Sequence, residues 1–264
     1  MVQHTAVAAA GSPDPISDAV VSPQASLLVR QILQAALQNA AGSQPPPAWV
    51  PEAQALLANV MMNDYLNWWN PGFPVDPNNV LAIANVSNPV SPLEYHARGL
   101  VRRGQGDPNG ASADFDQARR LAPTFARAHA QAGNQQALLG QPQNSHQDFQ
   151  NARNLNPRHP AIGYFDWGEG RAYFEEGNWA RAIDLLSQSV TELPTVWYNR
   201  CYLAAAQNAA GDTAAANRTV QDFINNFDQT TFDRIKQLKP NPNDPPPVAA
   251  ARKRFLDFFQ PRLP

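Results

Sequence analysis

Histidine side chains are the residues of this 264-residue chain best suited to metal binding or proton transfer, and their spacing indicates neither. The chain contains His4, His96, His129, His146 and His159. They are scattered, and neither an HExxH sequence nor a Cys-His cluster occurs, so the usual ligand spacings of a zinc site are missing. We therefore expect packed or solvated histidines, no metal site and no cofactor.

The other reactive side chains indicate no catalytic centre either. The single cysteine, Cys201, has no histidine near it in the sequence, so a structural thiol is expected. Two acidic pairs occur, Asp114 with Asp116 and Glu175 with Glu176. Residues one or two apart on a helix point in different directions, so neither pair can share a proton. The sequence predicts that the chain is not an enzyme.

The composition restricts the classes of partner. Hydrophobic residues make up 43% and charged residues 16% of the chain, enough to bury a core, while the net charge of -2 gives no general attraction to nucleic-acid phosphates. One cysteine cannot form an internal disulfide framework. No apolar run reaches the ~20 residues that span a bilayer, and the first residues lack the pattern of a signal peptide. We expect a cytoplasmic protein that does not bind nucleic acid and does not span a membrane.

A set of small, aromatic and proline residues recurs about every 34 residues between positions 92 and 228. The first three copies are Gly99, Gly106, Ala111, Phe115, Ala118 and Pro123; Gly133, Gly140, Ser145, Phe149, Ala152 and Pro157; and Gly170, Gly177, Ala182, Leu186, Ser189 and Pro194. A fourth copy consists of Ala204, Gly211, Ala216, Val220 and Phe223, with Asp228 in place of the proline. This period predicts four similar structural units.

Each position in the repeat has a physical reason. In the third copy, Gly170 and Ala182 are small enough to let two helices approach closely. Gly177 is expected to end the first helix in the left-handed conformation, and Asn178 to accept hydrogen bonds from the free amides of the second helix. Pro194 cannot continue that helix. Each copy is therefore predicted to fold as helix, turn, helix, turn.

This pattern resembles the tetratricopeptide repeat, with four copies over residues 92–228. The resemblance implies an all-α fold, a right-handed superhelical solenoid of antiparallel helix pairs. It also implies a concave inner surface that is lined mainly by the first helix of each copy.

The flanking segments are predicted to be mostly helical. Helices are expected over Gln24–Ala40, Pro51–Trp69, Phe232–Leu238 and Val248–Phe259, with an ordered loop over 70–91. The last two helices are expected to cap the open end of the solenoid. The predicted division is a disordered tail over 1–23, N-terminal helices and a loop over 24–91, the repeats over 92–228, and capping helices with a tail over 229–264.

The flanks resemble the carboxy-terminal region of bacterial class III adenylate or guanylate cyclases and of related winged-helix regulators. The resemblance rests on the DYLNWW sequence at 64–69, before the repeats, and on FLDFFQPRLP at 255–264, after them. The chain contains no segment that could be a cyclase domain or a winged helix. The resemblance therefore implies, as an alternative function, a regulatory module that acts on a separate effector chain.

The repeat register predicts which side chains line the inner surface. The expected partner-binding residues are His96, Arg103, Arg127, Asn134, Tyr164, Trp167, Arg171, Phe174, Tyr198 and Asn208. The third copy contributes three aromatic residues beside an arginine, a combination that is enriched at protein interfaces, although aromatic residues at helical spacing also form cores. We predict a non-catalytic scaffold that binds a peptide or helix of a protein partner in this groove.

Overall fold

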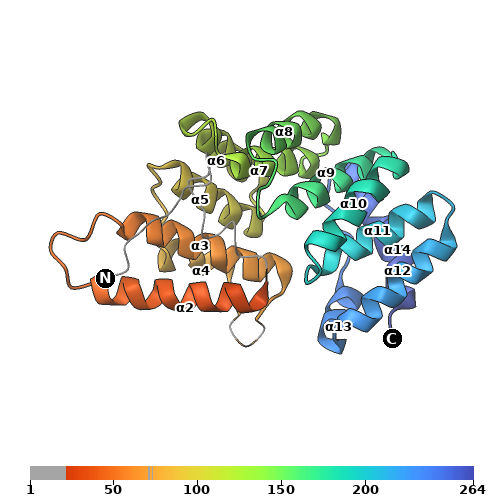
Figure 1. The fold of residues 1–264 in the computed structure, drawn as a ribbon, viewed down its shortest axis with the longest axis horizontal. Helices are drawn as coiled ribbons and strands as arrows, with labels where there is room; N and C mark the ends of the chain where they lie inside the picture. Colours follow the sequence, from red (N-terminus) through yellow and green to blue (C-terminus); the bar gives the residue numbers. More distant parts are fainter. Residues whose placement is uncertain (1–21, 71, 73) are drawn as a thin grey trace. The chain divides into compact units, whose positions relative to one another are not determined.

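The computed structural model describes residues 22–264 apart from 71 and 73, and all regular structure within them is helical (Figure 1). The α-helices are α2 (Pro23–Ala40), α3 (Val50–Asn67), α4 (Pro77–Ile83), α5 (Pro92–Gly104), α6 (Pro108–Leu121), α7 (Ala126–Leu138), α8 (Pro142–Leu155), α9 (Ile162–Glu176), α10 (Trp179–Glu192), α11 (Trp197–Ala209), α12 (Thr213–Asn226), α13 (Gln229–Gln237) and α14 (Pro246–Phe259), followed by the short 3-10 helix η1 (Gln260–Arg262). Consecutive helices pack in pairs: α5 with α6, α9 with α10, and α11 with α12. The all-α prediction is therefore confirmed.

The chain forms two compact units. Among the described residues, one unit contains those up to His129 and Asn151–Pro160, and the other contains Ala130–Gln150 and Ala161–Pro264. The limits of the units fall inside α7, inside α8 and between α8 and α9, all within the repeats. The four-part division of the chain made from the sequence stays a prediction.

The turn between the two helices of each copy has the conformation predicted from the sequence. The four glycines that end the first helices, Gly106, Gly140, Gly177 and Gly211, have φ angles of 80°, 80°, 81° and 91°. Only glycine adopts this left-handed conformation without strain. Asp107 Oδ1 then accepts a hydrogen bond from Gly110 N at 2.9 Å, and Asp212 Oδ1 accepts one from Ala215 N at 2.8 Å. Each aspartate thus caps the second helix of its pair.

The close approach of paired helices differs in detail from the prediction. A Cβ added to Gly133 would lie 2.9 Å from the backbone oxygen of Ser145, the small residue expected to face it. A Cβ added to Gly170 would instead lie 2.9 Å from Leu186 Cγ. Leu186 lies one turn after the expected partner, Ala182, and therefore on the same helix face. The small residue brings the helices together, and the larger one fills the space over the glycine.

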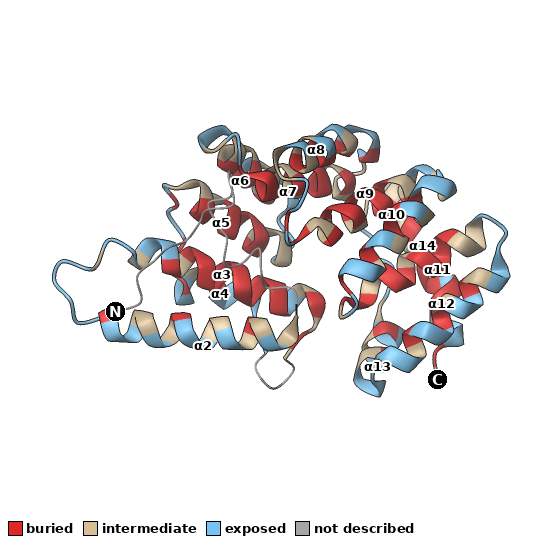
Figure 2. Ribbon diagram, viewed as in Figure 1, coloured by how far each residue is buried: buried red, intermediate tan, exposed pale blue. Residues whose placement is uncertain are grey.

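In the first unit, α2 begins with a side-chain cap. Residues 1–21 of the expected disordered tail lie outside the described residues, but Ser22 accepts a hydrogen bond from Ala25 N at 3.2 Å and Pro23 opens α2. The next helix, α3, packs against α2, α4 and α5 and is buried over most of its length (Figure 2). It forms the centre of this unit's core.

The prediction of a loop over 70–91 is wrong in part, because α4 lies within it. Asp76 Oδ1 accepts a hydrogen bond from Asn78 N at 2.9 Å, and Pro77 occupies the first turn. An aspartate followed by proline is a typical helix start. The helix has only 7 residues, too few for a hydrophobic period to reveal it.

In the second unit, the two C-terminal helices have different positions. Phe232 of α13 packs on Phe223 of α12, with ring centroids 5.7 Å apart, so α13 extends the order of the preceding helices. The last helix, α14, contacts α11 and α9, and its Phe259 ring lies edge-on to Phe223 of α12 at 5.0 Å. It was expected to cap an open end, and it covers part of the first helices of the third and fourth copies.

A candidate partner-binding surface on α9 and α11

One face of α9 carries four side chains that succeed one another by three or four residues: Tyr164, Trp167, Arg171 and Glu175. This spacing places them on a single side of the helix. We call them the α9 stripe. The first two residues are aromatic and the last two carry opposite charges, so the two ends of the stripe have different chemistry.

The aromatic end of the stripe meets α11. The Trp167 ring centroid lies 4.5 Å from that of Tyr198 and 6.5 Å from that of Tyr202. Tyr164, Trp167 and Tyr198 are each partly exposed, and we call these three residues the aromatic patch. The Trp167 Nε1–H group has no hydrogen-bond acceptor among the residues that the structure describes. That atom is itself buried, so the patch offers only the exposed parts of its rings.

Arg171 connects α9 to α7. Its Nη2 donates a hydrogen bond to the backbone oxygen of Asn134 at 3.2 Å, and its guanidinium carbon lies 5.2 Å from the centroid of the Trp167 ring. Its Nε lies 3.3 Å from Glu175 Oε1. Its contacts hold Trp167 and Asn134 on either side of one planar group.

Glu175 has the most perturbed carboxyl group of this surface. Burial raises its pKa to about 7, with smaller contributions in the same direction from Asp244 and Glu176, while Arg171 and Arg252 act against the rise. Its Oε2 atom has no hydrogen-bond donor in the described part of the chain. Glu175 was expected only to form a pair with Glu176 that cannot share a proton, because its burial depends on tertiary packing that leaves no local pattern.

The charged end of the surface is covered by the chain itself. Phe255 of α14 stacks on Tyr202 of α11, with ring centroids 5.6 Å apart and planes 18° from parallel. Just before α14, Asp244 pairs with Arg252 at 2.5 Å, and both charges act on Glu175. The C-terminal segment therefore occupies part of the face that was predicted to be a free groove, and the aromatic patch remains partly open.

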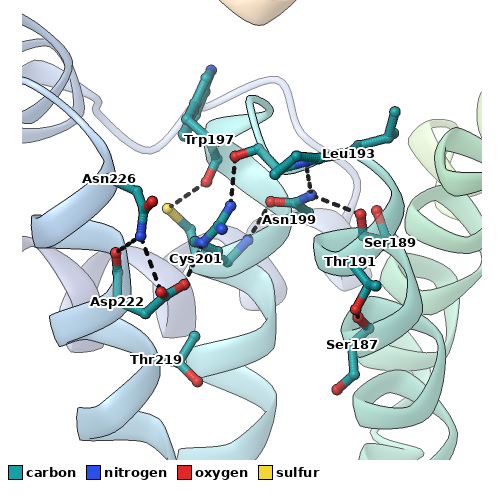
Figure 3. A network of polar contacts seen from close by, with 12 residues as sticks. Ser187, Ser189, Thr191, Leu193, Trp197, Asn199, Cys201, Thr219, Asp222 and Asn226 are labelled. Atoms are coloured by element: carbon teal, nitrogen blue, oxygen red, sulfur yellow. Dashed lines mark hydrogen bonds and ion pairs between the residues drawn. The ribbon is translucent and has the colours of Figure 1, made fainter. Parts of the chain in front are cut away.

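A polar network connects α11 with α10 and α12 (Figure 3). Asn199 Nδ2 donates to the backbone oxygens of Ser189 at 3.2 Å and Leu193 at 3.0 Å, which closes the end of α10. Arg200 Nε donates to Asp222 Oδ2 on α12 at 2.6 Å. These bonds join α11 to both neighbouring helices, so Tyr198 stands on a well-anchored turn.

Cys201 belongs to this core. It is fully buried, and its Sγ–H donates to the backbone oxygen of Trp197 at 3.3 Å. Burial raises the pKa of the thiol well above its usual range, so the reactive thiolate form is disfavoured. The interpretation of Cys201 as a structural thiol agrees with this environment.

Two residues predicted to line the groove are core residues instead. Phe174 has no exposed surface, and its ring lies edge-on to Trp179 and Tyr202 at centroid distances of 5.4 Å and 5.6 Å. In the other unit, His96 is also fully buried, with Nδ1 2.9 Å from Asn59 Oδ1. Inward register alone does not distinguish accessible positions from positions that a neighbouring helix covers.

The remaining predicted residues have mixed environments. Arg127 is 5% exposed. Burial, followed by the charges of Arg127 and Arg103, lowers the pKa of His96 well below its usual value. Arg103 lies over the Phe115 ring, 4.8 Å from its centroid. Asn208, near the end of α11, accepts a hydrogen bond from Thr213 Oγ1 at 3.4 Å. Contacts join four of the ten predicted residues into one cluster: Asn134, Trp167, Arg171 and Tyr198.

Comparisons with known proteins do not identify a family for this chain. No model of a protein family matches the sequence, and no curated protein matches it. Over residues 22–264 apart from 71 and 73, no three histidine, cysteine or acidic side chains are grouped so that they could hold a metal ion. Within the same residues, no helix has the length and apolar character needed to cross a bilayer.

Proposed function

We propose that this chain is a non-catalytic scaffold, built from tetratricopeptide-like repeats, that binds a segment of another protein at the aromatic patch. One observation carries this proposal: Trp167 is partly exposed, and its ring packs on that of Tyr198, which is also partly exposed. Tryptophan and tyrosine are enriched among the residues that contribute most to protein binding.

The exposed parts of the aromatic rings give the surface a reason to bind. A partner that covers them would bury apolar area, which favours a protein segment with an apolar side.

The rigidity of the surface also supports binding. The Arg171 contact with Asn134 holds α9 against α7, and Asn199 and Arg200 hold α11 against its neighbours. Side chains that are already ordered lose little conformational entropy when a partner docks.

Selection of peptides from a random displayed library on the purified chain tests this function. Peptides selected on the wild type would be synthesised, and their affinities measured for the wild type and for Trp167→Ala. We expect at least a tenfold loss on Trp167→Ala. Trp49→Ala serves as the matched control, because Trp49 is 44% exposed and lies in the other unit. Equal affinity for all three proteins would overturn the assignment.

A further inference from the structure

All exposed side chains of α2 lie on one face of this helix, and none of them is charged. We call these residues the α2 face: Gln24, Leu28, Gln31, Ile32, Ala35, Gln38 and Asn39. At 3.6 residues per turn they fall within an arc of about 120°. Ser26, Leu33 and Ala40 are buried on the opposite side, and α2 packs on α3. Figure 2 shows exposed segments along the length of α2.

The centre of the α2 face is apolar. Leu28 and Ile32 are 58% and 57% exposed and lie one turn apart, so their side chains are neighbours. Ala35 continues the apolar line towards the end of the helix. Large apolar side chains that are exposed side by side are typical of interaction sites, whereas single ones are common on any surface. The α2 face therefore gains free energy when another surface covers it.

The lack of charge on the α2 face restricts what can cover it. Arg30, the one charged residue of α2, is turned inward, with Nη1 3.7 Å from Asp64 Oδ2 and 12% of its side chain exposed. The solvent side of α10, in contrast, carries the exposed pair Arg181 and Asp184. A charged partner would find no counter-charge on the α2 face. Two copies of the α2 face can meet without repulsion between like charges.

The order of residues along the α2 face is complementary to itself. In an antiparallel pair with a two-fold axis between Gln31 and Ile32, Leu28 of one copy would lie opposite Ala35 of the other. Gln24 would lie opposite Asn39, and each amide has both a donor and an acceptor, so the two can bond to each other. A large side chain thus faces a small one, and an amide faces an amide. The antiparallel direction also sets the helix dipoles favourably.

We propose that α2 is a self-association surface, on which the α2 face of one molecule packs antiparallel on that of a second copy of this chain. The surface lies in the first unit and does not include the aromatic patch. With 18 residues, α2 is about 27 Å long. One pair of such helices buries less than the roughly 1,200 Å² of a standard stable interface, so we expect a Kd on the order of 10–100 µM.

Sedimentation velocity of the full chain, from about 1 µM to about 1 mM, tests the proposal. The wild type should change from monomer to dimer over this range. Ile32→Glu should raise the Kd at least about tenfold, because it places two carboxylates beside the two-fold axis. Leu121→Glu is the matched control: Leu121 is 46% exposed on α6 of the same unit, and this variant should keep the Kd of the wild type.

A double variant, Gln24→Glu with Asn39→Lys, tests the direction of packing. In the antiparallel pair each new carboxylate faces a new ammonium group, so the dimer should become roughly 2–10-fold tighter, as for two exposed ion pairs. Parallel packing would place like charges opposite each other and weaken the dimer. Circular dichroism melting establishes that each variant is folded. If Ile32→Glu does not fold, the double variant still decides the matter.

Three results would overturn the proposal. A wild type that stays monomeric up to about 1 mM would exclude a second copy, and residues 1–21 or an unrelated protein would then be the alternatives for covering the α2 face. Equal Kd values for the wild type and a folded Ile32→Glu would place the dimer contact on another surface. A weaker dimer of the double variant would contradict the antiparallel arrangement.

Discussion

Arg171 and Glu175 form an ion pair one turn apart on α9, with Arg171 Nε 3.3 Å from Glu175 Oε1 and only 5% and 1% of their side-chain surfaces exposed. The hydrogen bonding of the carboxyl group is incomplete, because Glu175 Oε2 has no donor among the described residues. Ionisation of the carboxyl is therefore poorly compensated despite the nearby cation. Stability of this unit should depend on pH for that reason.

Glu175 should make the protein less stable as pH rises through neutrality. Burial raises its pKa from 4.5 to about 7, so between these values the folded state keeps a proton that the unfolded state has lost. The resulting stabilisation is fully present below about pH 4.5 and is lost as pH rises through about 7, with a size on the order of 3 kcal/mol. Urea denaturation between pH 4 and 8 measures this dependence. Glu175→Gln should remove it.

The matched control for this experiment is Asp184→Asn, because the Asp184 side chain is 62% exposed. This variant should keep the pH profile of the wild type. If Glu175→Gln and the wild type have the same profile, the carboxyl of Glu175 does not hold a proton at neutral pH.

His146 should titrate above its ordinary value. Its Nδ1 lies 3.3 Å from Glu169 Oε1 and its Nε2 lies 2.9 Å from Glu176 Oε1. Burial lowers the pKa of His146, but the hydrogen bonds and charges of the two carboxylates outweigh this and raise it above 6.5. The group therefore stabilises the fold below about pH 6.5, and this contribution is lost as pH rises through the higher folded pKa.

An NMR titration of the His146 ring measures its pKa directly. Glu176→Gln should lower this pKa, because it removes one of the two negative charges beside the ring. His96 provides an internal comparison, since burial and nearby arginines lower its pKa well below 6.5. A titration of His146 below that of a solvated histidine would contradict the arrangement.

Gly133→Ala should destabilise the second unit, because its Cβ would meet a backbone atom. The new Cβ would lie 2.9 Å from the backbone oxygen of Ser145, which cannot rotate away. Overpacking of this kind costs about 1–3 kcal/mol, while the change from glycine to alanine within a helix contributes about 1 kcal/mol of stability. We expect a net loss of about 1 kcal/mol in urea denaturation.

Gly42→Ala is the control for that loss. No heavy atom lies within 4 Å of a Cβ placed on Gly42, so this substitution should change stability by less than about 0.5 kcal/mol. An unchanged or higher stability of Gly133→Ala would show that α7 and α8 do not approach as closely as described.

The ends of the helices could be predicted from the sequence because their causes are local. Gly177 adopts φ 81° and ends α9, and Asn178 accepts from Arg181 N at 3.4 Å to cap α10. The left-handed conformation and the capping bond involve only residues within a few positions. Asp228 accepts from Thr231 N at 2.8 Å and starts α13, so a capping residue stands where the other copies have proline.

The accessible part of the candidate surface could not be predicted in the same way. Phe174 and Trp167 are both aromatic residues on the inward register of α9, yet Phe174 is fully buried and Trp167 is partly exposed. Tyr202 of α11 lies edge-on to both rings, but Phe174 also packs edge-on to Trp179 of α10. Packing between separate helices decides which ring is covered, and a repeat period contains no information about it.

Phe255→Ala should separate α14 from the face of α9 and α11. Phe255 is 4% exposed, and its stacked contact with Tyr202 lies in the middle of the buried side of α14. Truncation of a buried phenylalanine costs about 3–5 kcal/mol, so urea denaturation should show a loss of that size. Because α14 follows a proline-rich joint, hydrogen exchange should rise first in residues 246–259.

Lys253→Ala, at a side chain that is 68% exposed, should change neither measurement. If the amides of α14 stay as protected in Phe255→Ala as in the wild type, α14 is held by other contacts, and the cover that it provides over Glu175 does not depend on this ring.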